Sequence, residues 1–134
     1  MRLHEAAMQY VDVPFRFRGR SERGVDCSGH LVLSMQTFGD PIPDRTNYGR
    51  EPWNDGLEES LDELFNVADF PLQVDDIVLM SIPGRNEPQH IGIICPYTEG
   101  LGIVHARCEF KKVIYHHLDP STVSHILKVY RGRR

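Results

Sequence analysis

The spacing of apolar residues changes from helical to strand-like near the middle of the chain. In the first half, apolar side chains recur every three or four residues, which is typical of a helix with one buried face. This pattern predicts helices over residues 3–11, 26–38 and 55–67. Asp26 is the expected N-cap of the second helix. The predicted inner stripe of that helix consists of Cys27, Leu31, Met35 and Phe38.

After Pro71 the chain consists of short apolar runs separated by Gly and Pro residues, a pattern that predicts strands joined by turns. Five strands are expected, at residues 77–80, 90–95, 103–106, 113–116 and 126–130. Helices followed by a strand meander favour an α+β fold with a mainly antiparallel, five-stranded sheet. The 134 residues suffice for one domain with a real core, so a single domain over residues 1–134 is expected.

Charge and hydropathy exclude several classes of function. The formal net charge is -4, which argues against nucleic-acid binding by electrostatic attraction. No apolar run approaches the roughly 20 residues that a membrane span needs. The first residues lack the apolar stretch of a secretory signal, so we expect synthesis in the bacterial cytoplasm without a signal peptide. The odd number of cysteines, three, favours free thiols over a disulfide framework.

Cys27 stands at the predicted start of a helix, where unpaired backbone N–H groups and the helix dipole favour a thiolate. Two histidines, His90 and His105, lie on neighbouring predicted strands. Attack on an amide needs a nucleophile, a base and a group that orients the base. We therefore expect Cys27 to attack, His90 to act as base, and His105 to fix its tautomer, with the backbone N–H of Cys27 as an oxyanion donor.

Three segments carry a resemblance to a known family: Val25-Asp26-Cys27-Ser28-Gly29, His90-Ile91-Gly92-Ile93 and Val104-His105-Ala106. They resemble the NlpC-type cell-wall cysteine peptidases, a papain-like family. The resemblance implies helices packed on a sheet, with the nucleophile at a helix N-terminus. It also implies that Asp26 and Ser28 bind substrate and that the site needs no metal or cofactor. The implied substrates are peptidoglycan stem peptides, cleaved between D-glutamate and the following diamino acid.

A smaller group within that family consists of short members from phage tails and gene-transfer particles. The segment 113–131 resembles this group. The resemblance implies tail-tip or baseplate proteins as partners, a mature location in the virion or phage-like tail tip, and a role in penetration of the cell wall. Two residues depart from the family pattern, since Phe15 stands where tyrosine is common and His30 where an apolar residue is usual.

Several alternatives remain open at this point. Cys27 with His30 and His105 with Cys108 could form two zinc-ligand pairs. Residues three apart on a strand point to opposite sides of the sheet, however, which argues against the second pair. The protein could also be a tail-tip structural subunit with a vestigial site, or an amidase or acyltransferase acting on another substrate. The arginine-rich loop before Cys27 and the remaining histidines, His116 among them, are interpreted as surface features.

Overall fold

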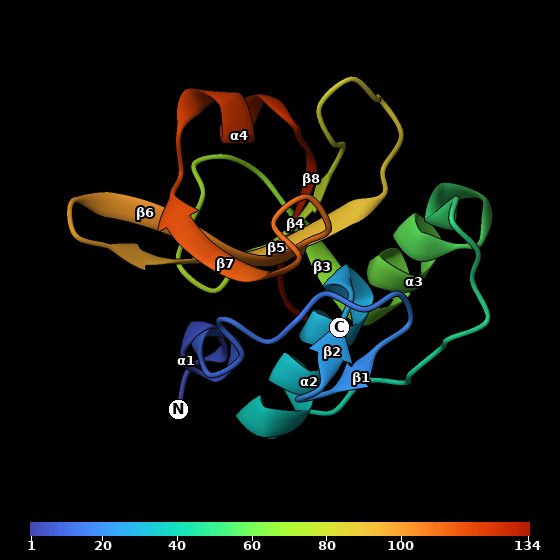
Figure 1. Ribbon diagram of the computed structural model, residues 1–134. Coiled ribbons are helices and arrows are strands. Elements are labelled where there is room, and N and C mark those ends of the chain that lie inside the picture. Colours follow the sequence, from blue (N-terminus) through green and yellow to red (C-terminus); the bar gives the residue numbers. More distant parts are fainter.

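An antiparallel sheet forms the second half of the chain in the computed structural model, which describes residues 1–134 (Figure 1). Its strands lie in the order β3-β8-β4-β5-β6-β7, and every neighbouring pair is antiparallel. The bounds are β3 Phe65–Ala68, β4 Ile77–Met80, β5 His90–Tyr97, β6 Gly100–Arg107, β7 Lys112–His117 and β8 Ile126–Arg133. The predicted α+β fold is confirmed, and each of the five predicted strands is present in the sheet.

The sheet has six strands rather than the predicted five, because the helix expected over residues 55–67 ends early. Helix α3 covers Leu57–Leu64, and Phe65 then adopts an extended conformation with φ of -132°. The following residues form β3, in which Val67 lies opposite Tyr130 of β8. The backbone partners of this edge strand lie far along the chain, so the helical spacing of its side chains concealed it.

Helix α2, Cys27–Phe38, lies where it was predicted, and α1, Leu3–Met8, ends three residues earlier than expected. Two short elements were not predicted, the 3-10 turn η1 Pro52–Asn54 and the helix α4 Pro120–Ser124. The predicted N-cap is confirmed, because the Asp26 carboxylate accepts a hydrogen bond of 2.8 Å from the Gly29 N–H. Helix α2 ends at Gly39, whose φ of 102° is the left-handed conformation of a C-terminal cap.

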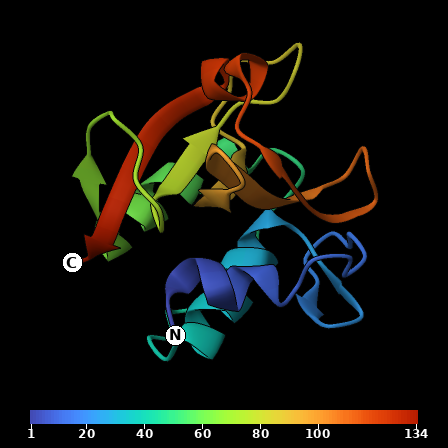
Figure 2. The same cartoon turned by 90° about the vertical axis from the view of Figure 1, so that its left-hand side faces the viewer.

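Apolar residues fill both faces of the sheet. On β4, Ile77 and Leu79 pack toward α1 and α2, whereas Val78 and Met80 pack on the opposite face. Helices α1 and α2 lie together on one side of the sheet, and α4 lies on the other (Figures 1 and 2). Because α2 packs against β5 and β6, its N-terminus comes to rest beside the start of β5.

The segment predicted as a loop, residues 15–24, contains a small hairpin. Its strands, β1 Arg20–Ser21 and β2 Gly24–Val25, are two residues long, too short to show a periodic pattern. The hairpin leads directly into Asp26 and α2, so it determines how the chain approaches Cys27. Among the helices, none combines the length and the apolar character that a membrane crossing requires.

Candidate active site

Cys27 and His90 line one cleft between the start of α2 and the start of β5. The Cys27 sulfur lies 3.9 Å from the carbonyl oxygen of Gln89, the residue before His90. The structure therefore brings two of the predicted site residues together from positions far apart in the sequence. The remaining walls of the cleft come from the lead-in segment, the 48–52 loop and the turn after β6, and include Phe15, Phe17, Tyr48, Arg50, Arg107 and Glu109.

Cys27 is partly buried, and its surroundings favour the thiol. Burial raises the pKa of Cys27 to about 12, and the negative charge of Asp26 contributes in the same direction. Hydrogen bonds from the Ile91 N–H and from Ser28 act against this but are weaker. Burial and the Asp26 charge therefore oppose the thiolate that the helix N-terminus was expected to yield, and they favour a thiol that needs a base to become a nucleophile.

Three imidazole rings form a continuous chain across neighbouring strands. His90 Nε2 on β5 lies 2.7 Å from His105 Nδ1 on β6. His105 Nε2 lies 2.9 Å from His116 Nε2 on β7, and His116 Nδ1 lies 2.8 Å from the carbonyl oxygen of His117. The predicted contact between His90 and His105 is thus present, and the chain extends one residue further than expected.

The two inner histidines are neutral. His90 is 6% exposed and His105 is fully buried. Burial, followed by the positive charge of Arg107, lowers the pKa of His90 to about 3. Burial and the neighbouring His90 lower the pKa of His105 as well. At neutral pH both rings therefore carry one proton each, and each offers one donor and one acceptor nitrogen.

His116 was expected to be a surface residue, but it also takes part in the chain of imidazole rings. The ring is only partly exposed, and it contacts His105. The sequence feature that could have indicated this contact is the alternation of side chains along β7, in which every second residue points to the same face of the sheet. His105 pairs directly with Ile114, and His116 lies two residues further along β7, on the same face of the sheet. Without the strand register, that relationship between the two histidines was not visible.

The Asp26 carboxylate is occupied by partners within the protein. One oxygen accepts hydrogen bonds from the Gly29 N–H and from Arg20 Nη1, and the other accepts from the Arg18 N–H and the Tyr48 hydroxyl. A carboxylate offers about four acceptor positions, so all are used. Asp26 thus caps α2 and orders the cleft wall. Its predicted contact with substrate stays a prediction, and it requires one of these partners to be exchanged.

Gly29 allows the hairpin to approach α2. A Cβ atom at this position would lie 2.0 Å from the carbonyl oxygen of Gly19. The close neighbour of Gly29 is therefore the loop that precedes Asp26.

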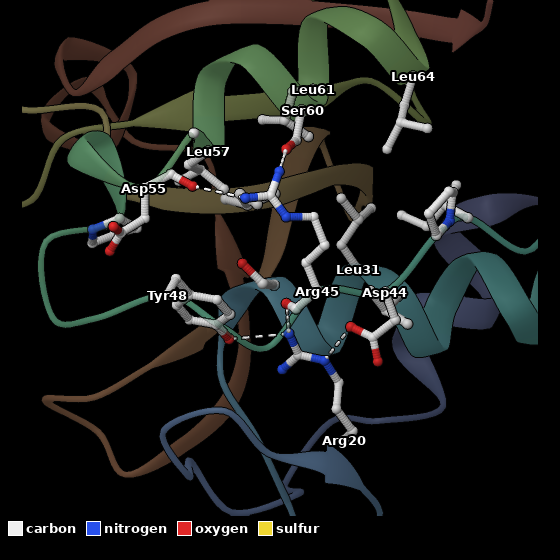
Figure 3. A pocket seen from close by; sticks show the side chains of 17 residues that line it. Arg20, Leu31, Asp44, Arg45, Tyr48, Asp55, Leu57, Ser60, Leu61 and Leu64 are labelled. Carbon is white, nitrogen blue, oxygen red and sulfur yellow. Dashed lines mark hydrogen bonds and ion pairs between the residues drawn. The ribbon is translucent and has the colours of Figure 1, made fainter.

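Three arginines hold the 42–56 loop that carries Tyr48, and Figure 3 shows two of them, Arg20 and Arg45. The third, Arg18, donates two hydrogen bonds to the Tyr48 carbonyl. Arg20 donates to Asp44, to the Arg45 carbonyl and to the Tyr48 hydroxyl. Arg45 donates to Ser60 on α3 and to the Asp55 carbonyl. A small pocket with a floor of leucines from α2 and α3 lies beneath these side chains. The arginine network therefore fixes the position of Tyr48 in the wall of the active-site cleft.

Two further residues of the cleft, Ser28 and Gln89, carry polar groups that can affect the reaction. Ser28 lines the cleft beside Cys27 and acts to lower the pKa of the thiol. Gln89 also lines the cleft, and its buried Nε2 has no hydrogen-bond partner. A buried donor without a partner is costly, so this amide is available to a ligand carbonyl. Sequence reasoning missed Gln89, for which no motif gave a signal.

His30 and Cys108, which could have been zinc ligands, make other contacts or are exposed. His30 Nε2 lies 3.0 Å from the Ala7 carbonyl, where it ties α2 to α1. Burial lowers the pKa of His30 to about 4, so the ring is neutral and donates this bond. Cys108 is exposed beyond the end of β6. No group of three or more histidine, cysteine or acidic side chains is arranged to hold a metal ion.

Comparisons with known proteins agree with this geometry. Residues 12–131 match the model of the NlpC/P60 family. An NlpC/P60 family protein from Bacillus cereus superposes with a TM-score of 0.67 at 19% identity, covering 96% of this chain and 38% of the other. A lipoprotein-like NLP/P60 family protein from Staphylococcus aureus gives 0.65 at 20% identity, covering 96% and 39%.

The NlpC/p60 domain of the peptidoglycan hydrolase SagA gives a TM-score of 0.62 at 18% identity, with 97% of this chain and 96% of that domain covered. The chain thus spans about two fifths of the first two proteins and nearly all of the third. These structures share the fold with the present chain. No curated protein sequence matches it.

Proposed function

The chain belongs to the NlpC/P60 family of cysteine peptidases, and from this premise we propose that residues 1–134 form one peptidase domain that hydrolyses amide bonds in peptidoglycan stem peptides. The observation that carries the proposal is the shared cleft of Cys27 and His90, with His105 2.7 Å behind His90. A nucleophile, a base and an orienting group are therefore present in the order that amide hydrolysis requires.

In the first step, His90 removes the thiol proton as the Cys27 sulfur attacks the scissile carbonyl carbon. His90 Nε2 is engaged with His105, so Nδ1 is the nitrogen available for this proton. The carbonyl oxygen takes up negative charge in the tetrahedral intermediate. The backbone N–H of Cys27 and the unpartnered Nε2 of Gln89 are the donors we assign to that oxygen.

In the second step, His90 returns the proton to the leaving amine, the C–N bond breaks, and a thioester to Cys27 remains. A water molecule, deprotonated by His90, then attacks the thioester and releases the acid. The raised pKa of Cys27 and the lowered pKa of His90 keep both groups neutral at rest. Transfer of the proton before attack is therefore unfavourable, and we propose that it occurs as the sulfur attacks the carbonyl carbon.

The activity is tested by digesting purified peptidoglycan and identifying the released fragments by mass spectrometry. We expect new amino and carboxyl termini within the stem peptide, and none with the Cys27→Ala variant. Release of intact stem peptides from the glycan would instead indicate an amidase. Transfer of an acyl group to an added amine would indicate an acyltransferase. Absence of any product would indicate a structural subunit with a vestigial site. Phe15 favours this alternative, because it lacks the hydroxyl of the tyrosine that is common at this position.

For the bond cleaved, we propose the amide between D-glutamate and the following diamino acid, on the basis of the family resemblance of the nucleophile and base segments. Two synthetic stem peptides distinguish this bond from its neighbours. One contains the D-glutamyl linkage, and the matched control contains L-glutamate joined through its α-carboxyl group. Cleavage of the first alone supports the assignment, whereas equal cleavage of both contradicts it.

For the biological setting, we propose the tail tip of a phage or phage-like particle, where local hydrolysis opens the wall. The support is the resemblance of residues 113–131 to short phage-tail members. Quantitative mass spectrometry of purified particles tests this setting, with tail-tip or baseplate proteins as the expected neighbours in crosslinks. A protein found in culture fluid and absent from particles would contradict the setting while leaving the proposed chemistry intact.

A further inference from the structure

We propose that His116 is a positioning residue that sets which nitrogen of His90 carries the proton. The inference deepens the proposed function and rests on it for its catalytic meaning. It starts from the three-ring chain described above, in which His116 is the outermost imidazole and the His117 carbonyl is the terminal group.

The direction of every hydrogen bond follows from that carbonyl. A backbone carbonyl only accepts, so the His116 nitrogen beside it, Nδ1, must carry a proton. A neutral His116 then has a bare Nε2, which accepts from His105 Nε2–H. A neutral His105 in turn has a bare Nδ1, which accepts from His90 Nε2–H. The lone pair of His90 is thereby left on Nδ1, the atom that the proposed mechanism uses.

The opposite direction is not available to three neutral rings. If His105 Nδ1 carried the proton, His105 Nε2 would be bare and would need a donor from His116 Nε2. His116 Nδ1 would then be bare as well and would face the His117 carbonyl, two acceptors at 2.8 Å. The neutral chain therefore has one satisfied arrangement, and its terminal carbonyl selects it.

The same arrangement supports the charged state of His90. When His90 accepts the thiol proton, it becomes a buried imidazolium, which burial disfavours. Its Nε2–H then donates to a His105 nitrogen whose basicity is increased by the bond that His105 gives to His116. Loss of the His116 acceptor would leave the His105 Nε2–H without a partner. His105 could then adopt its other tautomer, with the proton on Nδ1, and His90 would no longer be held with its proton on Nε2.

Two substitutions of His116 distinguish the effect of its hydrogen-bond acceptor from the effect of its volume. His116→Gln keeps an amide oxygen near the Nε2 position, whereas His116→Leu keeps volume and removes the acceptor. The control is His125→Gln, since the His125 ring contacts the Ser81 hydroxyl at 3.0 Å and takes no part in the three-ring chain. All variants are first compared with the native protein by circular dichroism.

On a stem peptide, we expect His116→Leu to lower kcat by about 10- to 100-fold with KM nearly unchanged, a part of the factor that a general base contributes. His116→Gln should recover most of this loss, and His125→Gln should match the native protein. A His116→Leu variant with native kcat, or a His116→Gln variant as slow as His116→Leu, overturns the proposal.

A second measurement needs no turnover. Two-bond ¹H–¹⁵N correlation spectra distinguish protonated from bare imidazole nitrogens, with each ring assigned from its own variant. At pH 7 we expect His90 and His105 protonated on Nε2 and His116 on Nδ1, and a mixture of His90 tautomers in His116→Leu. A native His90 protonated on Nδ1 overturns the inference. If the protein cleaves no stem peptide, the proposed function fails, and these spectra still decide the tautomer assignment.

Discussion

His90 Nε2 lies 2.7 Å from His105 Nδ1, and the two buried rings come from adjacent strands of the sheet. This contact leaves only His90 Nδ1 for the cysteine that shares its cleft. The relationship gives the two histidines different tasks. His90 exchanges a proton, whereas His105 accepts a hydrogen bond from His90 and donates one to His116.

The unequal tasks predict unequal variants. His90→Ala should lower turnover of a stem peptide to the level of Cys27→Ala, a loss on the order of 10³-fold or more. His105→Asn should keep measurable activity, because an amide oxygen can accept the His90 Nε2–H. His105→Ala should fall between the two. Steady-state kinetics on variants shown to be folded test the order. A His105→Asn variant that is less active than His90→Ala would reverse our assignment.

The raised pKa of Cys27 predicts how its alkylation depends on pH. Below a pKa of about 12 the thiolate fraction rises with pH, so the rate of reaction with iodoacetamide should increase about tenfold per unit between pH 7 and 9. In the resting protein the exposed Cys108 should be labelled before Cys27 at pH 7. Peptide mapping after limited labelling measures both sites. A Cys27 rate that is high and constant over this range would show a preformed thiolate–imidazolium pair instead.

Buried neutral histidines predict that acid destabilises the fold. His30 and His90 have folded pKa values of about 4 and about 3, below the ordinary 6.5 of an unfolded chain. Between pH 6.5 and these folded pKa values, the unfolded state binds more protons than the folded state does. The contribution of the neutral rings to stability is therefore complete above pH 6.5 and decreases as the pH is lowered. Each ring contributes a loss of roughly 1.4 kcal/mol per pH unit within that window.

Urea unfolding at pH 7, 6 and 5 measures this effect in a range where carboxylates titrate little. His30→Gln provides the matched comparison, because it removes one titrating ring and keeps a donor for the Ala7 carbonyl. The variant should lose less stability between pH 7 and 5 than the native protein does. Equal slopes for both proteins would show that His30 is not held neutral by the fold.

The contact between Gly29 and Gly19 predicts a destabilised variant. Gly29→Ala places a Cβ atom 2.0 Å from a backbone carbonyl oxygen, which no rotamer change relieves. We expect a loss of about 1–3 kcal/mol in the free energy of unfolding, as for overpacked sites. The control is Gly49→Ala, whose Cβ would meet only the Asp55 carboxylate at 3.5 Å. Similar losses for both variants would contradict the steric argument.

Much of the fold could be predicted because its patterns are local. The α2 helix has its N-cap, its buried stripe of Leu31 and Met35, and its terminal glycine within a few residues of one another. Each of the five predicted strands is a short, mostly apolar segment, a pattern visible in neighbouring residues alone. The sixth, β3, is stabilised by pairing with β8, and the preceding helical spacing gives no sign of that distant partner.

The candidate site divides in the same way. The motif around Cys27 and the histidines at 90 and 105 are visible as residue types at informative positions, so the sequence alone determined the α+β class and the residues to inspect. Their electrostatics were not visible. The thiolate expected at Cys27 depended on the helix N-terminus alone, whereas the raised pKa comes from burial and from the Asp26 charge, which exist only after packing.

Tertiary structure decided the remaining features of the site. The pairing of β6 with β7 puts His116 behind His105, and a shift of one residue would have turned its ring to the other face. The α2–β5 packing brings Cys27 to the Gln89 carbonyl, and the 42–56 loop brings Tyr48 to Asp26. These contacts join residues far apart in the chain. A one-dimensional pattern reports which face a side chain occupies, but only the folded chain determines what lies opposite it.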